Sequence, residues 1–133
     1  MTAFSTIVRA FAVAMVAAGG CHAFLGLSAD RILDAGLPVS ILKLASLDSQ
    51  NRFYGAMFGV AGAVLWVAAG NLERYDTILR ILLCGGVLAG VLRLVSIAWV
   101  GWPSPLVIAL MVIELCGTPL LLVWYAHVRK ARR

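Results

Sequence analysis

The sequence predicts an all-α integral membrane protein, a four-helix bundle with a long outer loop between helices 1 and 2. Of its 133 residues, 62% are hydrophobic and only 13% are charged, whereas about 25% of a typical soluble domain is charged. The apolar residues form long runs without strand-like alternation, which excludes a β-barrel. This composition also excludes a disordered chain and a soluble domain, and three cysteines are too few for a disulfide scaffold.

Four segments are apolar and long enough to cross a bilayer as helices, which takes about 20 residues each. They are 10–26, 53–70, 81–100 and 105–126. The intervening segments are too short for a soluble domain, so residues 1–133 are predicted to form a single transmembrane domain. Residues 18–21 loosely resemble a lipoprotein cleavage site, but a helix face of small residues explains them better.

The outer loop, residues 27–52, is predicted to have structure of its own. Ser28 can cap a short helix over Ala29–Ala35, and Gly36 suits the position that follows its end. The apolar stretch 41–47 contains a single lysine. It either lies in the membrane interface or covers the mouth of the bundle.

The ends of the other spans carry capping and kinking signals. Asp48 or Ser49 can cap the second span. Ser104 and Pro105 suit the N-cap and the first position of the fourth span. Pro119 removes a helix hydrogen bond and clashes with the preceding turn, so the fourth span is predicted to kink there.

With four spans, both termini lie on one side of the membrane, and the distribution of lysine and arginine indicates which side it is. The terminal side carries Arg9, Arg74, Arg80, Arg129, Lys130, Arg132 and Arg133, whereas the other side carries Arg31, Lys43 and Arg52. The predicted localisation is therefore the bacterial inner membrane, with several spans and both termini cytoplasmic. Nucleic acid is not a predicted partner, because the basic tail is short and adjoins a span.

Polar residues inside the spans are the main candidates for a functional site, since an ionisable residue there is costly and needs a partner. They are His22, Arg52, Arg93 and Glu114, with Ser96 close by. Arg93 and Glu114 each lie about 12–13 Å along their helices from the predicted outer turn, so they can meet as a bidentate ion pair. All these residues are predicted to converge on the outer half of the bundle, beneath the long loop.

The charge of this predicted cluster allows several interpretations. Its two arginines and one glutamate leave a charge of +1 when its histidine is neutral. Water, a bound anion or the loop carboxylates Asp30, Asp34 and Asp48 can balance that charge. The pair of Arg93 and Glu114 is then either a structural staple that sets helix register or part of a polar ligand pocket.

Small residues lie on the same helix faces as the polar ones. Gly55 and Gly59 form one small-xxx-small pattern, and Gly86 and Gly90 form another. Such patterns let membrane helices approach closely, so these four glycines are predicted to pack helices together.

Several of these residues together resemble one bacterial family. They are Asn51-Arg52-Phe53-Tyr54-Gly55 with Gly59, then Gly86, Gly90, Arg93-Leu94 and Ser96, then the turn at 101–105, and finally Glu114-Leu115. Over roughly residues 50–116 this spacing resembles the domain-of-unknown-function family 4345, which consists of small four-helix membrane proteins. The resemblance implies that the arginines, the serine and the glutamate belong to the family pattern, and it implies no particular activity.

Functions of different kinds remain open. The protein is either an accessory or interaction subunit of a larger membrane assembly or a binder of a lipid or an apolar anion. The alternative is an enzyme acting on a lipid-like substrate, with Glu114 or His22 as acid–base group, although no nucleophile–base pair stands out. A proton-coupled antiporter needs an unpaired glutamate, and the nearby Arg93 argues against it.

No cofactor and no metal site is predicted. The three cysteines lack paired spacing, and the two histidines, His22 and His127, lie near opposite faces of the membrane. The expected partners are membrane lipid and either another membrane protein or a second copy of the chain.

Overall fold

The computed structural model describes residues 2–33 and 38–130, and every regular element within these ranges is a helix. The elements are α1 (Thr2–Leu25), α2 (Leu27–Leu33), η1 (Val39–Lys43), α3 (Ala45–Gly70), α4 (Asp76–Val100), α5 (Pro105–Val112), η2 (Ile113–Gly117) and α6 (Thr118–Lys130). η1 is a 3₁₀-helix and η2 is a π-helix. The predicted all-α fold is confirmed.

Four continuous helical stretches are long and apolar enough to cross a membrane. They are Ala3–Leu25, Ala45–Gly70, Asp76–Val100 and Pro105–Lys130. The first three helices begin roughly one to two turns before the predicted starts. Hydropathy places these extra turns outside the spans because they contain polar residues such as Ser5 and Arg52. In the folded chain these side chains bond to neighbouring helices.

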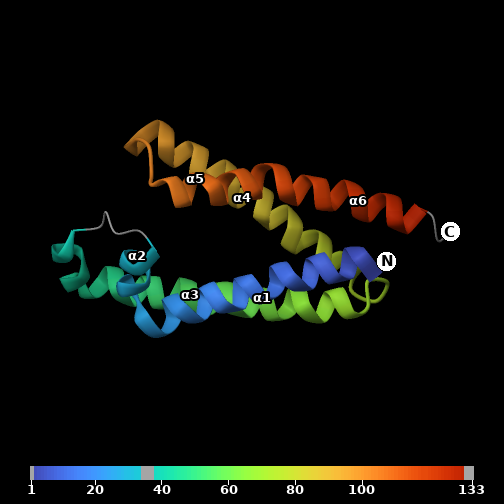
Figure 1. Ribbon diagram of the computed structural model, residues 1–133, viewed down its shortest axis with the longest axis horizontal. Helices are drawn as coiled ribbons and strands as arrows, with labels where there is room; N and C mark the ends of the chain where they lie inside the picture. Colours follow the sequence, from blue (N-terminus) through green and yellow to red (C-terminus); the bar gives the residue numbers. More distant parts are fainter. Residues whose placement is uncertain (1, 34–37, 131–133) are drawn as a thin grey trace.

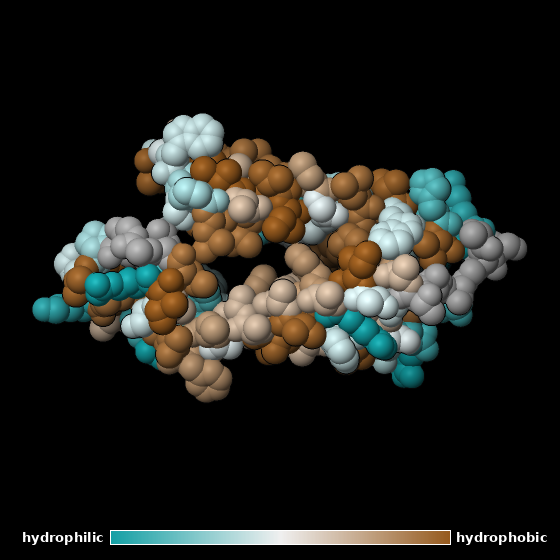
Figure 2. All heavy atoms as spheres, in the orientation of Figure 1, coloured by the Kyte–Doolittle hydropathy of each residue, from teal (hydrophilic) through white to brown (hydrophobic). Residues whose placement is uncertain are grey.

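The long helices pair into two antiparallel hairpins (Figure 1). α1 lies along α3, whereas α4 packs against η2 and α6. The hairpins meet at the end that holds both chain termini, called here the terminal end, and α4 crosses obliquely from one hairpin to the other. The opposite end, called the loop end, carries α2, η1 and the turn before α5. A dark opening separates the hairpins in the middle of the molecule (Figure 2).

A buried core joins the hairpins at the terminal end. Its largest fully buried side chains are Phe4, Val8, Leu65, Leu79 and Leu83. Phe4 stacks on Tyr125 with the ring centroids 5.3 Å apart, and the Tyr125 hydroxyl donates to the Leu72 carbonyl oxygen at 2.9 Å. Arg129 of α6 donates to Asp76 of α4 at 2.7 Å. This end is therefore closed by both apolar burial and bonded polar groups.

Glycines set the close approach of α1 and α3. A Cβ atom built on Gly19 would lie 2.6 Å from the Gly55 carbonyl oxygen, and one built on Gly62 would lie 2.8 Å from the Met15 Cβ. Gly59 lies opposite Gly19 across the same contact. The two backbones therefore touch, and a larger residue would push them apart.

Glycines also line the contact between α4 and the fourth span. A Cβ atom on Gly86 would lie 2.8 Å from the Thr118 Cγ2, and one on Gly90 would lie 2.8 Å from the Leu115 Cγ and 3.0 Å from the Glu114 Cβ. The backbone of α4 is thereby brought directly against the helix that carries the glutamate.

The segment predicted as an outer loop, 27–52, contains α2, η1 and the first two turns of α3. The predicted cap of the second span by Asp48 or Ser49 is wrong, because α3 begins already at Ala45. The Asp48 side chain bonds another helix instead. The predicted end of the short helix at Gly36 lies outside the described residues.

Other helix ends follow the predictions in part. The predicted cap at Ser28 is wrong, since α2 begins at Leu27. Pro105 is the first residue of α5 and Ser104 flanks it, but the serine side chain makes no capping hydrogen bond. Directly before Pro119 the fourth span changes from α-helix to the π-helix η2 and back.

Candidate functional site

The polar residues predicted to converge are divided between the two hairpins. One group, called here the loop-end network, consists of His22, Asp30, Asp48, Asn51 and Arg52. The other is the Arg93–Glu114 pair. No hydrogen bond or ion pair joins the two groups among the residues that the structure describes. Ser96 lies about one turn beyond the arginine of that pair on α4 and is exposed.

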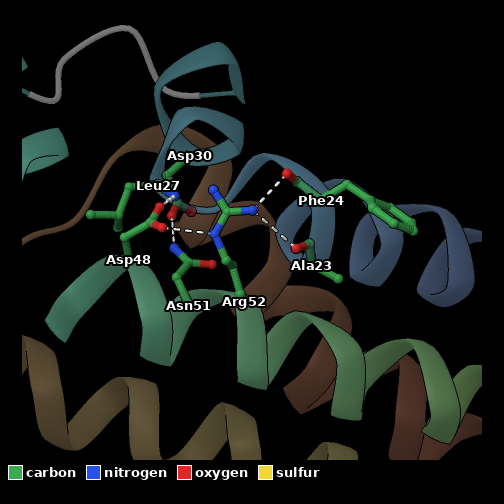
Figure 3. Close-up of polar contacts among 7 residues, drawn as sticks. All are labelled: Ala23, Phe24, Leu27, Asp30, Asp48, Asn51 and Arg52. Carbon is green, nitrogen blue, oxygen red and sulfur yellow. Dashed lines mark hydrogen bonds and ion pairs between the residues drawn. The ribbon is translucent and has the colours of Figure 1, made fainter. Parts of the chain in front are cut away.

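In the loop-end network, Arg52 and Asp48 hold the junction between α1 and α2 (Figure 3). The Arg52 Nε donates to the Asp48 carboxylate at 2.7 Å, and its Nη1 donates to the Phe24 carbonyl oxygen at 2.6 Å. The other Asp48 oxygen accepts the Leu27 backbone N–H at 3.0 Å. Two residues one turn apart on α3 thus cap the end of α1 and the start of α2.

The turn that they hold requires glycine. Gly26 has a φ of +57°, which other residues rarely adopt. A Cβ atom at this position would also lie 2.8 Å from the Asp48 Cγ. The network therefore closes on a turn that has no room for a side chain.

His22 is bonded on both sides of its ring. Its Nδ1 lies 2.8 Å from the Ala18 carbonyl oxygen and its Nε2 lies 3.0 Å from an Asp30 carboxylate oxygen. Asn51 donates to the other Asp30 oxygen. The His22 ring therefore ties α1 to α2, and Asn51 ties α3 to the same Asp30 carboxylate.

These contacts decide how the charges of the loop-end network are balanced. Arg52 is paired with Asp48, and His22 is paired with Asp30. Of the three predicted sources of negative charge, namely water, a bound anion and the loop carboxylates, the carboxylates Asp30 and Asp48 are the ones that pair with this part of the cluster.

The Arg93–Glu114 pair joins α4 to η2. The Arg93 Nε donates to one glutamate oxygen at 2.7 Å and its Nη2 donates to the other at 3.3 Å. The side chains are 35% and 17% exposed, respectively. The two residues meet, as their similar depths along the two helices predict. The bidentate contact makes the pair electrically neutral in apolar surroundings.

The glutamate stands in the π-helix, and the local sequence explains why the π-helix forms there. Pro119 has no backbone N–H to give to the Leu115 carbonyl oxygen. The Thr118 N–H bonds back to the Ile113 carbonyl oxygen, and the Thr118 hydroxyl bonds the Glu114 carbonyl oxygen. Short π-helical segments within α-helices are frequent at functional sites, which supports Glu114 as a candidate functional residue.

An apolar cleft of about 270 Å³ lies between α3 and the start of α4. We call it the interhairpin cleft. It is lined by Val60, Ala63, Val64, Val67, Ala68, Tyr75 and Ile78. Its lining residues Ala68 and Tyr75 also belong to, or pack against, the core that joins the hairpins.

A metal ion needs several ligating side chains that lie close together. Among residues 2–33 and 38–130, no three histidine, cysteine, aspartate or glutamate side chains lie close enough together to hold an ion. The three cysteines are free and exposed on the helix surfaces.

Two features of the site were missed or misplaced by sequence reasoning. The sequence does not predict the bond from Asn51 to Asp30, because the two residues lie on different helices, α3 and α2. The interhairpin cleft left no signal, because its lining residues are typical of any lipid-facing helix.

The helices, their apolar surfaces and the internally paired charges define a small multi-pass membrane protein. The family model described as "Domain of unknown function (DUF4345)" matches residues 3–125. The chain therefore belongs to this family, as its spaced motifs indicated. No curated protein and no solved structure matches the chain.

Proposed function

We propose that this protein binds one amphiphilic lipid between its two hairpins, with the apolar body of the lipid in the interhairpin cleft. The observation that supports this proposal is the cleft itself. It is apolar, it lies between helices that separate toward the loop end, and the Arg93–Glu114 pair stands farther along α4 in that direction. Pockets between the helices of a bundle with a few placed polar groups are the common form of a ligand site.

The geometry favours binding over the two other functions. A catalytic acid or base needs an atom available to the substrate, but both oxygens of Glu114 accept from Arg93 and both ring nitrogens of His22 lie against acceptor atoms. Small-residue faces can also dock a partner helix, but Gly19 and Gly86 are occupied by contacts within the chain, whereas the adjacent Gly20 and Gly85 are open.

The proposal is tested by filling the cleft. Val64→Trp places a large ring in it, whereas Val123→Trp makes the same change on an exposed face of α6. Native mass spectrometry of gently extracted protein is expected to show one retained lipid in the wild type and in Val123→Trp, and at least about tenfold lower occupancy in Val64→Trp, equivalent to about 1.4 kcal/mol. Equal lipid retention by both variants would contradict the proposal, as would a folded wild type with no lipid.

We also propose that the terminal end faces the cytoplasm. Arg9, Arg74, Arg80, Arg129 and Lys130 all belong to the helix ends and the turn on that side, which the positive-inside rule assigns to the cytoplasm. Green fluorescent protein fused to the C-terminus is expected to fluoresce, and alkaline phosphatase fused there is expected to be inactive. An active phosphatase and a dark fluorescent protein would reverse the orientation.

A further inference from the structure

We infer that the amphiphile in the interhairpin cleft is uncharged and that it carries a hydrogen-bond acceptor, such as an ester or hydroxyl oxygen, which binds Arg93. This inference rests on the proposed function, because it assigns the head group of the same ligand. Its supports are the charge pairing at the loop end, the donors that Arg93 has left, and the position of Arg93 relative to the cleft.

The charge pairing argues against an anionic head group. Arg52 is balanced by Asp48 and Arg93 by Glu114, so neither arginine has an unopposed charge to offer. A carboxylate or phosphate beside Arg93 would also lie beside the Glu114 carboxylate, and the apolar surroundings would screen that repulsion poorly. An uncharged head group avoids this repulsion.

Arg93 nevertheless has hydrogen bonds left to make. A guanidinium carries five N–H groups, and the Arg93 side chain makes two hydrogen bonds, both to Glu114, among the described residues. At 35% exposure the guanidinium reaches the surface of the hairpin. Donors left without an acceptor in hydrocarbon are unfavourable, so a neutral oxygen placed there completes the site.

The position of Arg93 fits a head group whose tail occupies the cleft. Arg93 and the cleft residue Ile78 both lie on α4, and helical spacing places them within about 60° of each other around its axis. Arg93 lies about 22 Å along the helix from Ile78, which is more than the roughly 15 Å depth of hydrocarbon in one leaflet but less than the roughly 30 Å of the whole core. A chain that runs from the pair to the cleft therefore crosses the bilayer midplane and stays within the hydrocarbon.

The facing surface of α3 is apolar along the same length. The cleft residues Val60 and Val64 continue toward the loop end as Met57 and Phe53 at the same helical spacing. Both of these side chains are exposed. An apolar surface on α3 thus faces a helix that carries the Arg93–Glu114 pair, which matches an amphiphile with a neutral head.

Two photoreactive probes with hydrocarbon chains of the same length test the head group. One is a monoacylglycerol, which is uncharged, and the other is an alkyl sulfonate, which is always anionic. The purified full-length protein in detergent micelles is cross-linked with each, and labelled residues are mapped by mass spectrometry. The monoacylglycerol is expected to label the residues around Val60 and Ile78 at least about tenfold more than the sulfonate does.

Glu114→Gln supplies the decisive variant. It keeps an acceptor for Arg93 but leaves the arginine charge unopposed, so labelling by the sulfonate is expected to rise about tenfold. Glu73→Gln, which makes the same charge change in the exposed turn at the terminal end, is expected to leave both probes unaffected. If Glu114→Gln does not fold, Arg93→Gln with Glu114→Gln is a neutral substitute in which the preference for the monoacylglycerol is expected to fall, because the arginine donors and the glutamate charge are both lost.

The outcomes separate this inference from the proposed function. Equal or stronger labelling of the cleft by the sulfonate in the wild type would overturn the neutral head group and leave the cleft as a lipid site. Labelling of the cleft by neither probe would overturn the lipid site itself. A sulfonate signal that does not change in Glu114→Gln would also contradict the assignment of the head group to Arg93.

Discussion

Gly19→Leu is expected to abolish the folded protein, whereas Gly20→Leu at the adjacent position is expected to be tolerated. A Cβ atom on Gly19 would lie 2.6 Å from the Gly55 carbonyl oxygen and 2.7 Å from the Gly59 Cα, while one on Gly20 would have no neighbour within 4 Å. The atoms met by Gly19 belong to the backbone of α3, which cannot move aside as a side chain can. The two helices would have to separate.

Gly19→Leu is expected to lower the free energy of unfolding by more than ordinary overpacking of a core does, which costs about 1–3 kcal/mol. Separation of α1 from α3 would also break the bonds from Arg52 to the end of α1. Thermal unfolding and size-exclusion chromatography in detergent measure the effect. Similar midpoints for the two leucine variants would show that the α1–α3 contact is not as close as described.

A second comparison on the other hairpin provides an internal control. Gly86 faces Thr118, whereas the adjacent Gly85 has no neighbour within 4 Å. The same ranking, with Gly86→Leu harmful and Gly85→Leu tolerated, is therefore expected there. In Gly86→Leu the new side chain would meet side-chain atoms of Thr118, which can move more easily than backbone. The loss of stability is therefore expected to be smaller than in Gly19→Leu.

The second large effect is expected from breaking the Arg93–Glu114 pair on one side only. Glu114→Leu leaves an arginine without its counter-charge in apolar surroundings. Removal of one partner of a fully buried pair typically costs about 3–5 kcal/mol, and the partial exposure of Arg93 lowers the cost expected here. The double variant Arg93→Leu with Glu114→Leu removes both charges, and such apolar replacements are often neutral or stabilising. The double variant is therefore expected to be more stable than Glu114→Leu alone.

Thermal unfolding of the wild type, the two single variants and the double variant forms a complete cycle. A double variant as unstable as the sum of the single ones would show that the two residues act independently. A stable double variant that has lost its bound lipid would separate the role of the pair in ligand binding from any role in stability. Arg80→Leu, which removes one partner from Asp76 while Arg129 remains, is a suitable control for a less critical ion pair.

The sequence alone determined the class of protein and most of its helices. Apolar runs of membrane-spanning length exclude other classes, because backbone polar groups in lipid are satisfied only within helices or closed barrels. The small-xxx-small pattern of Gly86 and Gly90 and the depths of Arg93 and Glu114 depend only on helical rise and spacing. These local rules hold in any arrangement of the helices, so they can be read without the fold.

The tertiary structure decided which polar residues meet. Arg52 was grouped with Arg93 because both lie toward the loop end, but in the fold Arg52 bonds the end of α1, on the other hairpin. Local sequence predicts Asp48 as a cap of its own helix, but its carboxylate caps α2. Helical periodicity gives the face and depth of a residue on its own helix and carries no information on which neighbour that face meets.

The interhairpin cleft likewise exists only in the tertiary structure. Its valines and alanines match those of any lipid-facing helix, and they become a cleft because α4 crosses obliquely from one hairpin to the other. That crossing depends on the core around Phe4, Leu79 and Tyr125, which joins residues from both ends of the chain. Membrane helices reveal their spans through composition, but the spaces between them depend on long-range packing that no single segment encodes.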